Sequence, residues 1–127
     1  MQISREKSQA NVVRAWEPGR IRIGEQWLHG HLIITAERVI ADWAVESPSR
    51  IDVASLEPAI ALAPEIILLG TGPELILPDV DLMAQLAAQR IGLEIMSTSA
   101  ACRTFNLLVH EDRRVAAALL NPAAEPE

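Results

Sequence analysis

The period of the hydrophobic pattern changes near residues 47–49, and this change constrains the fold more than any other feature of the chain. Before it, short apolar runs are separated by turn formers such as Pro18 with Gly19, and the run RIRIG alternates between polar and apolar side chains. Such runs predict strands with one buried and one solvated face. We expect an antiparallel meander over residues 12–16, 20–23, 26–29, 32–35 and 39–43.

After residue 49, short and nearly continuous apolar runs alternate with longer stretches of helical period. The expected strands are 65–69, 93–96 and 115–120, and the expected helices are 79–91, ended by Gly92, and 98–110. This order favours right-handed crossovers and parallel strands, and we expect both helices on one side of the sheet. The predicted fold class is α/β, an N-terminal antiparallel meander followed by a βαβαβ unit.

The length and composition predict one domain with an aliphatic core, since the chain has 127 residues, 50% of them hydrophobic and 22% charged. We expect that domain at residues 11–120, with loose tails at 1–10 and 121–127. The polar first residues do not resemble a secretion signal, and Pro64 and Glu65 interrupt the most apolar run. We therefore expect no membrane span and a cytoplasmic location.

The charge and the chemically reactive residues exclude several function classes. A net charge of −6 and scattered arginines argue against a nucleic-acid partner, because phosphate binding needs clustered positive charge. Cys102 could be a nucleophile near a helix start, but His110 is about 12 Å further along that helix, so a buried thiol is the simpler expectation. His29 and His31 lack a third ligand, and we expect no metal site and no cofactor.

The stretch LLGTGPEL at residues 68–75 leads an apolar strand into two glycines, as a phosphate-binding loop would. A P-loop needs a lysine after its second glycine, and the dinucleotide motif GxGxxG needs a third glycine where Leu75 stands. Pro73 also removes a backbone donor, and Glu74 adds negative charge. We interpret Gly70 and Gly72 as the exit from a buried strand, where a positive φ or a close backbone approach requires glycine.

The same turn could still take part in a small anion site. Because the carboxyl ends of parallel strands meet at one edge of the sheet, the turn is expected beside Thr98 and the start of the second helix. Arg103, one turn into that helix, could add its positive charge to the free amides there. Alternatively, the hydroxyls only cap the helix and the arginine is solvated. The candidate crevice for a ligand or partner comprises Gly70, Thr71, Gly72, Thr98, Arg103 and Asn106.

The stretches ILLGTG at residues 67–72 and EIMSTSAACRTFNLLVHEDRRVAAALLNPA at residues 94–123 resemble a family of small domains. That family includes the mitochondrial complex I (NADH dehydrogenase) assembly factor 3, the adipogenesis-associated domain protein and many uncharacterised bacterial proteins. A looser similarity covers the first half of the chain. The resemblance implies a three-layer β/β/α fold and no established enzymatic activity. Within the matched stretch, Phe105 is expected in the core, and Asn106 is expected to hydrogen-bond the glycine turn.

Two functions remain open at this stage. The first is a non-enzymatic binding or assembly-factor-like domain, because the resemblance implies protein partners for the mitochondrial member of the family. The alternative is a protein that binds a small anionic ligand, or an enzyme, using the crevice between the Gly70–Gly72 turn and Thr98. A deep crevice with convergent polar groups would favour the second function, and a crevice filled by side chains would favour the first.

Overall fold

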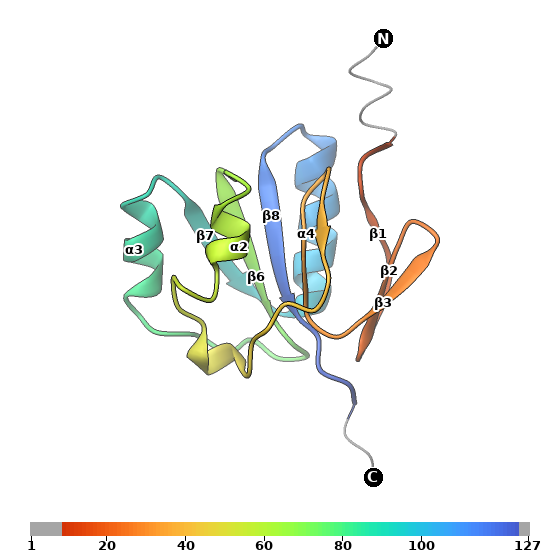
Figure 1. The fold of residues 1–127 in the computed structure, drawn as a ribbon, viewed down its shortest axis with the longest axis horizontal. Helices are drawn as coiled ribbons and strands as arrows, with labels where there is room; N and C mark the ends of the chain where they lie inside the picture. Colours follow the sequence, from red (N-terminus) through yellow and green to blue (C-terminus); the bar gives the residue numbers. More distant parts are fainter. Residues whose placement is uncertain (1–8, 125–127) are drawn as a thin grey trace.

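The computed structural model describes residues 9–124, which form two β-sheets and a small number of helices (Figure 1). Most of the two expected tails, residues 1–8 and 125–127, lies outside the described residues. The strands are β1 (Val13–Glu17), β2 (Arg20–Ile23), β3 (Gln26–His29), β4 (Leu32–Ile34), β5 (Val39–Ile40), β6 (Ile66–Thr71), β7 (Gly92–Met96) and β8 (Val115–Leu120). The helices are the short 3-10 helix η1 (Pro48–Arg50), α2 (Glu57–Ile60), α3 (Leu82–Ala87) and α4 (Thr98–His110).

The strands divide between a small sheet and a large one. The small sheet has the order β1-β2-β3 and is antiparallel throughout. The large sheet has the order β5-β4-β8-β6-β7, in which β6 pairs in parallel with both β7 and β8, as expected from the sequence. The meander therefore ends after β3, because β4 and β5 add to the large sheet next to β8. All three residues of β4 are buried, and only a strand covered on both faces can have that pattern.

The two long helices lie on opposite faces of the large sheet, so the expectation that they share one side is wrong. Ile67 and Leu69 of β6 pack in the same cluster as α2 and α3, whereas Leu68 packs in the cluster that contains α4 and the small sheet. Figure 1 shows the resulting layers, with α2 and α3 on one side and α4 with β1–β3 on the other. The chain moves one place outward from β6 to β7 and then back past β6 to β8. Right-handed crossovers in opposite directions must lie on opposite faces.

The core is aliphatic and centred on β8, which has no exposed residue. Three consecutive alanines in this strand let the layers on both faces approach closely. Phe105 is completely buried between α4 and the small sheet, which confirms its expected place in the core. The α/β fold class and its three layers are thus confirmed.

Two details of the chain ends and turns differ from expectation. Asn121, placed by the sequence analysis in the C-terminal tail, is 1% exposed. Its side chain accepts a hydrogen bond from the Trp16 indole and donates one to the carbonyl of Glu17, which joins the end of β8 to the small sheet. Gly92 does not end α3, because it is already in β7. Arg90 instead adopts the left-handed conformation after that helix, with φ of 64°.

Candidate functional site

The glycine turn and the start of α4 do lie together, as the sequence predicts. The N–H of Gly72 donates to the Thr98 hydroxyl at 2.8 Å, and the N–H of Thr98 donates to the carbonyl of Gly72, also at 2.8 Å. The same hydroxyl donates to the carbonyl of Leu120 at the end of β8. We call this set of contacts the Thr98 junction. It joins the carboxyl ends of β6 and β8 to the first turn of α4.

The two glycines of the junction are required for different reasons. A side chain at Gly70 would meet the Cα and the hydroxyl oxygen of Thr98 at 3.0 Å, and Leu119 at 3.1 Å, so these neighbours would have to shift to admit it. A side chain at Gly72 would make only an ordinary contact, with Pro122 at 3.7 Å, but Gly72 has a φ of +99°, which L side chains rarely adopt. The interpretation of the turn as a strand exit needing close approach and positive φ is therefore confirmed, one glycine for each requirement.

The hydroxyl groups of the expected crevice are already engaged within the protein. Thr98 is 0% exposed, and its hydroxyl has a donor on one side and an acceptor on the other. The buried hydroxyl of Thr71 accepts from the N–H of Ile76 at 3.0 Å and lies 2.6 Å from the carbonyl oxygen of Glu74. Ser97, rather than Thr98, caps α4, since its side chain accepts from the N–H of Ala100. The arrangement stabilises the junction and aims neither threonine hydroxyl at solvent.

The other two residues of the expected crevice point elsewhere. Arg103 is exposed on α4. Asn106 does not bond the glycine turn, because two helical turns separate it from Thr98 and it faces β1. Its side-chain oxygen accepts from the N–H of Val13 at 2.8 Å, and its side-chain nitrogen donates to the carbonyl of the same residue at 2.9 Å. Asn106 thus positions the small sheet on α4.

The reactive side chains are placed for packing. Cys102 is buried in the cluster around α4, and this burial raises the pKa of its thiol to about 12, only partly offset by the nearby charge of Arg103. The Nδ1 atom of His31 accepts a hydrogen bond from the N–H of Asn121, and burial lowers the pKa of His31. Within residues 9–124, no group of three or more His, Cys, Asp or Glu side chains could hold a metal ion.

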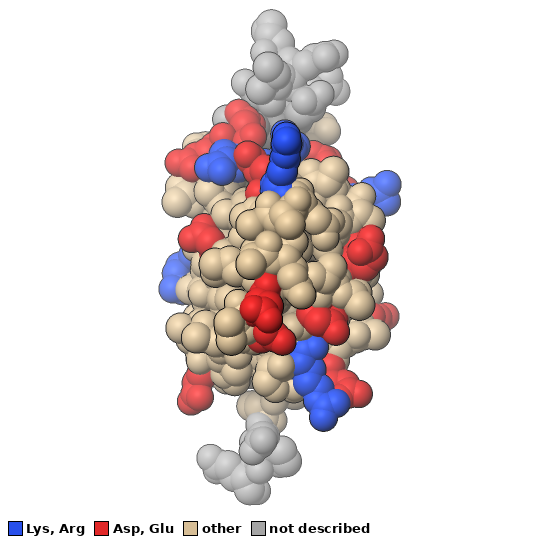
Figure 2. All heavy atoms as spheres, turned by 90° about the vertical axis from the view of Figure 1, so that its left-hand side faces the viewer, with Lys and Arg blue, Asp and Glu red and all other residues tan. Residues whose placement is uncertain are grey.

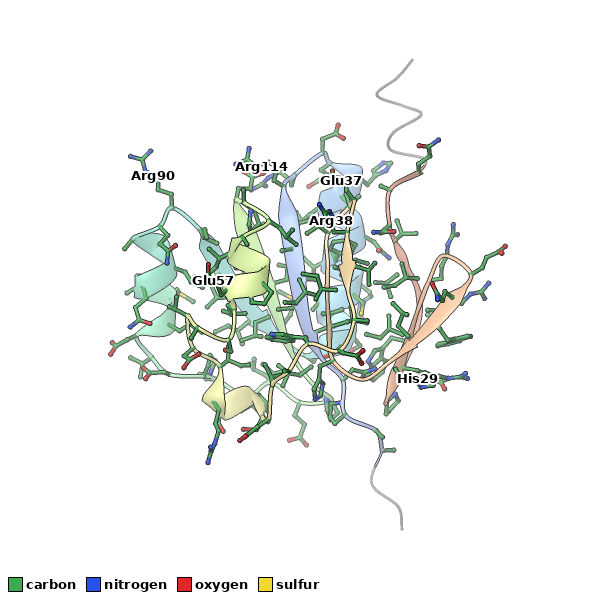
Figure 3. All side chains as sticks on the ribbon, viewed as in Figure 1. His29, Glu37, Arg38, Glu57, Arg90 and Arg114 are labelled. Atoms are coloured by element: carbon green, nitrogen blue, oxygen red, sulfur yellow. The ribbon has the colours of Figure 1, made fainter. Side chains whose placement is uncertain are left out.

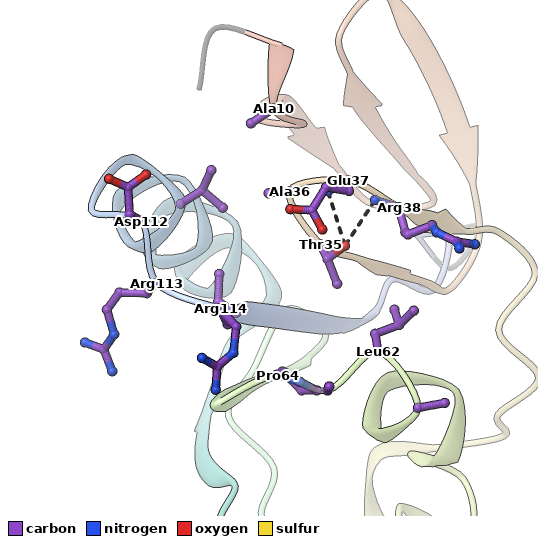
Figure 4. A pocket seen from close by; sticks show the side chains of 14 residues that line it. Ala10, Thr35, Ala36, Glu37, Arg38, Leu62, Pro64, Asp112, Arg113 and Arg114 are labelled. Atoms are coloured by element: carbon purple, nitrogen blue, oxygen red, sulfur yellow. Dashed lines mark hydrogen bonds between the residues drawn. The ribbon is translucent and has the colours of Figure 1, made fainter. Parts of the chain in front are cut away.

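A cavity of about 510 Å³ lies at the opposite end of the sheet, where β6 and β8 begin (Figure 4). Three connections form its walls: residues 35–38 between β4 and β5, 61–64 before β6, and 112–114 before β8. Its polar groups mainly hold these walls, since the Thr35 hydroxyl accepts from the N–H groups of Glu37 and Arg38. In Figure 4 the Arg38 guanidinium points away from Thr35.

One charged group beside the cavity, the Glu65 carboxylate, is also bound within the protein. The Glu65 carboxylate accepts from the N–H of Arg114 and from the Arg113 side chain, each at 3.0 Å, and these two contacts lower its pKa. The labelled charged residues at this end of the molecule have both signs, including Glu37, Arg38 and Arg114 (Figure 3). This mixture of charges does not select one class of ligand.

Most of the large exposed apolar side chains among the described residues lie on the connection between β6 and β7. We call the five exposed apolar side chains of this connection the apolar ridge; they are Leu75, Ile76, Leu77, Val80 and Met83. Leu77 is 69% and Val80 is 89% exposed. Figure 2 shows the side of the molecule that carries α3, where acidic side chains stand among uncharged surface and basic side chains lie toward the upper and lower ends.

Sequence reasoning missed the ridge. In the helix expected over 79–91, Met83 shares an apolar stripe with Leu82 and Leu86, whereas the observed α3 begins at Leu82 and buries only Leu82 and Leu86. The signal was present in the stretch ELILPDVDLM at residues 74–83, where apolar residues cluster with neither a helical nor an alternating period. A proline within such a stretch, here Pro78, indicates an irregular connection whose apolar side chains have no sheet or helix to pack on.

The described residues form a small α/β domain, and comparison with known proteins shows its family. Residues 13–120 match the model of a protein family of unknown function (DUF498/DUF598), and the chain belongs to that family. It is 31% identical to a 13 kDa major membrane protein of Francisella tularensis over 94% of this chain and 99% of the relative. It is 32% identical to the NADH dehydrogenase [ubiquinone] 1 alpha subcomplex assembly factor 3 of Danio rerio, covering 96% of this chain and 71% of the relative.

A solved structure supports the same placement. The crystal structure of a protein from Bordetella parapertussis superimposes with a TM-score of 0.81 at 36% sequence identity, covering 88% of this chain and 96% of that one. The resemblance to the complex I assembly factor 3 family is therefore confirmed, together with the fold it implies. No helix among the described residues is long and apolar enough to cross a membrane.

Proposed function

We propose that this protein is a non-enzymatic, assembly-factor-like domain in the cytoplasm that binds a protein partner through the apolar ridge. The observation that carries the proposal is the ridge itself, because five large apolar side chains within nine residues are exposed to solvent. Isolated exposed apolar residues are ordinary, but a contiguous apolar patch with a polar rim is typical of protein interaction sites. The relatives named as assembly factors support a role of this kind.

The chemistry of the interior supports a binding role over a catalytic one. The Thr98 hydroxyl is engaged in the Thr98 junction, and the Thr71 hydroxyl is engaged with the backbone of Glu74 and Ile76. The buried Cys102 thiol has a raised pKa that keeps it protonated near neutral pH. Arg103 is left as the exposed member of the expected anion crevice. A small anion bound near it would contact that side chain without the two threonine hydroxyls.

Site-specific photocrosslinking in the native cell tests this proposal. A photoreactive amino acid replaces Leu77 on the ridge, and in a matched control it replaces Leu107, a 56% exposed leucine on α4. We expect irradiation to give a discrete protein adduct from position 77 and none from position 107. Equal labelling at both positions, or no adduct at position 77, would contradict the proposal.

A further inference from the structure

The edge of the large sheet beside the ridge has no neighbouring strand. β7 ends the strand order and pairs only with β6, so one side of its backbone is without a strand partner. The other edges differ: β5 has two residues, β3 has four, and Asn106 bonds both backbone groups of Val13 in β1. An unpaired strand edge is a template for an added strand from another chain. Among the described edge strands whose backbone has no side-chain partner of the kind that Asn106 gives β1, β7 is the longest.

The ridge begins near the carboxyl end of β7. The Thr71 hydroxyl accepts from the N–H of Ile76 and lies 3.3 Å from the carbonyl oxygen of Met96, so the first part of the ridge lies beside the carboxyl end of β7. Further along, Leu82 and Leu86 of α3 pack in the same cluster as Leu93 of β7. A strand added to β7 would therefore place every second side chain toward α3 and the ridge.

The opposite face of the added strand would meet negative charge. Glu94, the middle residue of β7, is exposed, and side chains alternate along a strand, so it points away from the α3 side, to which Leu93 contributes. Exposed acidic residues also lie among the ridge residues in the sequence, at Glu74, Asp79 and Asp81, whereas the segment 73–96 has one basic residue, Arg90. The net charge of the chain is −6. A cationic strand is complementary to this surface, and an anionic one is repelled.

The same charge disfavours a second copy of this chain as the occupant. A two-fold antiparallel pairing of β7 with itself, centred on the strand, would place Glu94 opposite the Glu94 of the other copy. Directly opposed like charges destabilise a strand pair. Anionic lipid surfaces are disfavoured for the same reason, because exposed Glu74, Asp79 and Asp81 lie in the same segment as the ridge. A partner segment that carries both apolar and positively charged side chains is complementary to the ridge and to the acidic residues.

We infer that β7 and the apolar ridge together accept an extended segment of a partner protein, added as an edge strand, in which apolar and basic residues alternate. The inference rests on the proposed function and names the chemistry of the partner. The apolar side chains of the segment lie on the ridge and on α3. Its lysine or arginine side chains lie on the side of Glu94. The backbone hydrogen bonds supply affinity, and this alternation supplies specificity.

Peptide titration of the whole protein tests the inference. The probes are a fluorescent eight-residue peptide of alternating Val and Lys, its Val and Glu counterpart, and a peptide with the four Val and four Lys in separate blocks. We expect the alternating Val–Lys peptide to bind about tenfold more tightly than either of the others at low salt. Equal affinity for the alternating and block peptides would overturn strand addition.

Three variants locate the binding surface. Glu94→Lys should reverse the preference, so that the Val–Glu peptide binds more tightly than the Val–Lys peptide. Leu77→Ser should weaken Val–Lys binding about fivefold, and Leu107→Ser, the matched control on α4, should leave it unchanged. An unchanged preference in Glu94→Lys, or equal losses in both serine variants, would overturn the inference.

The outcome separates this inference from the proposed function. A protein adduct at position 77 together with no peptide preference refutes the charged-strand partner and leaves the binding function in place. If position 77 gives no adduct and the peptides show no preference, both the proposed function and this inference are refuted. Binding of the protein to phosphatidylglycerol vesicles at the same salt, lost in Leu77→Ser, would make a membrane the occupant and overturn the inference.

Discussion

Replacing Thr98 by Val keeps the shape of the side chain and removes the hydroxyl that joins β6, α4 and β8. The N–H of Gly72 would lose its hydrogen-bond acceptor inside the protein, and leaving a buried donor without a partner costs about 1–3 kcal/mol. The carbonyl of Leu120 would lose one donor, which costs about 1 kcal/mol more. The free energy of unfolding should therefore fall by about 2–4 kcal/mol, a large part of the stability of an ordinary domain.

Urea unfolding followed by tryptophan fluorescence measures this loss. The matched control is Thr98→Ser, which keeps the hydroxyl and removes one methyl group, and it should cost about 1 kcal/mol. Both variants should have the slope of the parent protein, because the surface exposed on unfolding is the same. If Thr98→Val were as stable as Thr98→Ser, the hydrogen bonds of the Thr98 junction would not carry the stability assigned to them here.

Four further perturbations have defined outcomes. Gly70→Ala should destabilise the fold strongly, because its new Cβ would meet the backbone of Thr98 at 3.0 Å, and a melting temperature within a degree of the parent would refute this. Phe105→Ala should lower the free energy of unfolding by about 3–5 kcal/mol in urea titration, and a loss below about 1 kcal/mol would show that the ring is not in the core. Cys102 should not react with iodoacetamide at pH 8 in the native state, because the pKa of its thiol is about 12 there, and it should react once the protein is unfolded. Rapid labelling of the native protein would show an accessible thiolate and contradict this. Burial lowers the pKa of His31 below its ordinary 6.5, so the unfolded state binds more protons than the folded state in acid. The free energy of unfolding should therefore fall as the pH drops below about 6.5. In urea titrations between pH 5 and 8, His31→Gln should reduce this dependence on pH.

Much of the second half of the chain was predictable from local pattern. The buried run at β6 and the capped, amphipathic helix α4 have strong signals, because each pairs a regular period with a clear boundary. The proximity of Thr98 to the glycine turn followed from the rule that parallel strands end at one edge. These predictions succeeded because the responsible interactions are local or are fixed by handedness.

The remaining features depend on contacts between distant residues. The order of β8, β6 and β7 decides on which face each helix lies, and no local pattern encodes that order. Asn106 bonds Val13 across 93 residues, so its partner could not be inferred from its position within α4. Met83 of the apolar ridge was assigned to a buried helix face because hydrophobicity alone does not show whether a neighbouring element is available to cover a side chain.

The position of β8 within the large sheet has a consequence for folding during synthesis. It is the last of the described strands to be made, yet it lies between β4 and β6 and is buried on both faces. Until the ribosome has made β8, β4 and β6 lack the partner between them, and the apolar faces of α4 and the small sheet have an incomplete surface to cover. Non-local strand pairing of this kind delays folding and leaves apolar surface exposed in the nascent chain. We expect nascent chains arrested before residue 115 to be sensitive to protease and to bind chaperones, and protection to develop in one step once β8 has emerged.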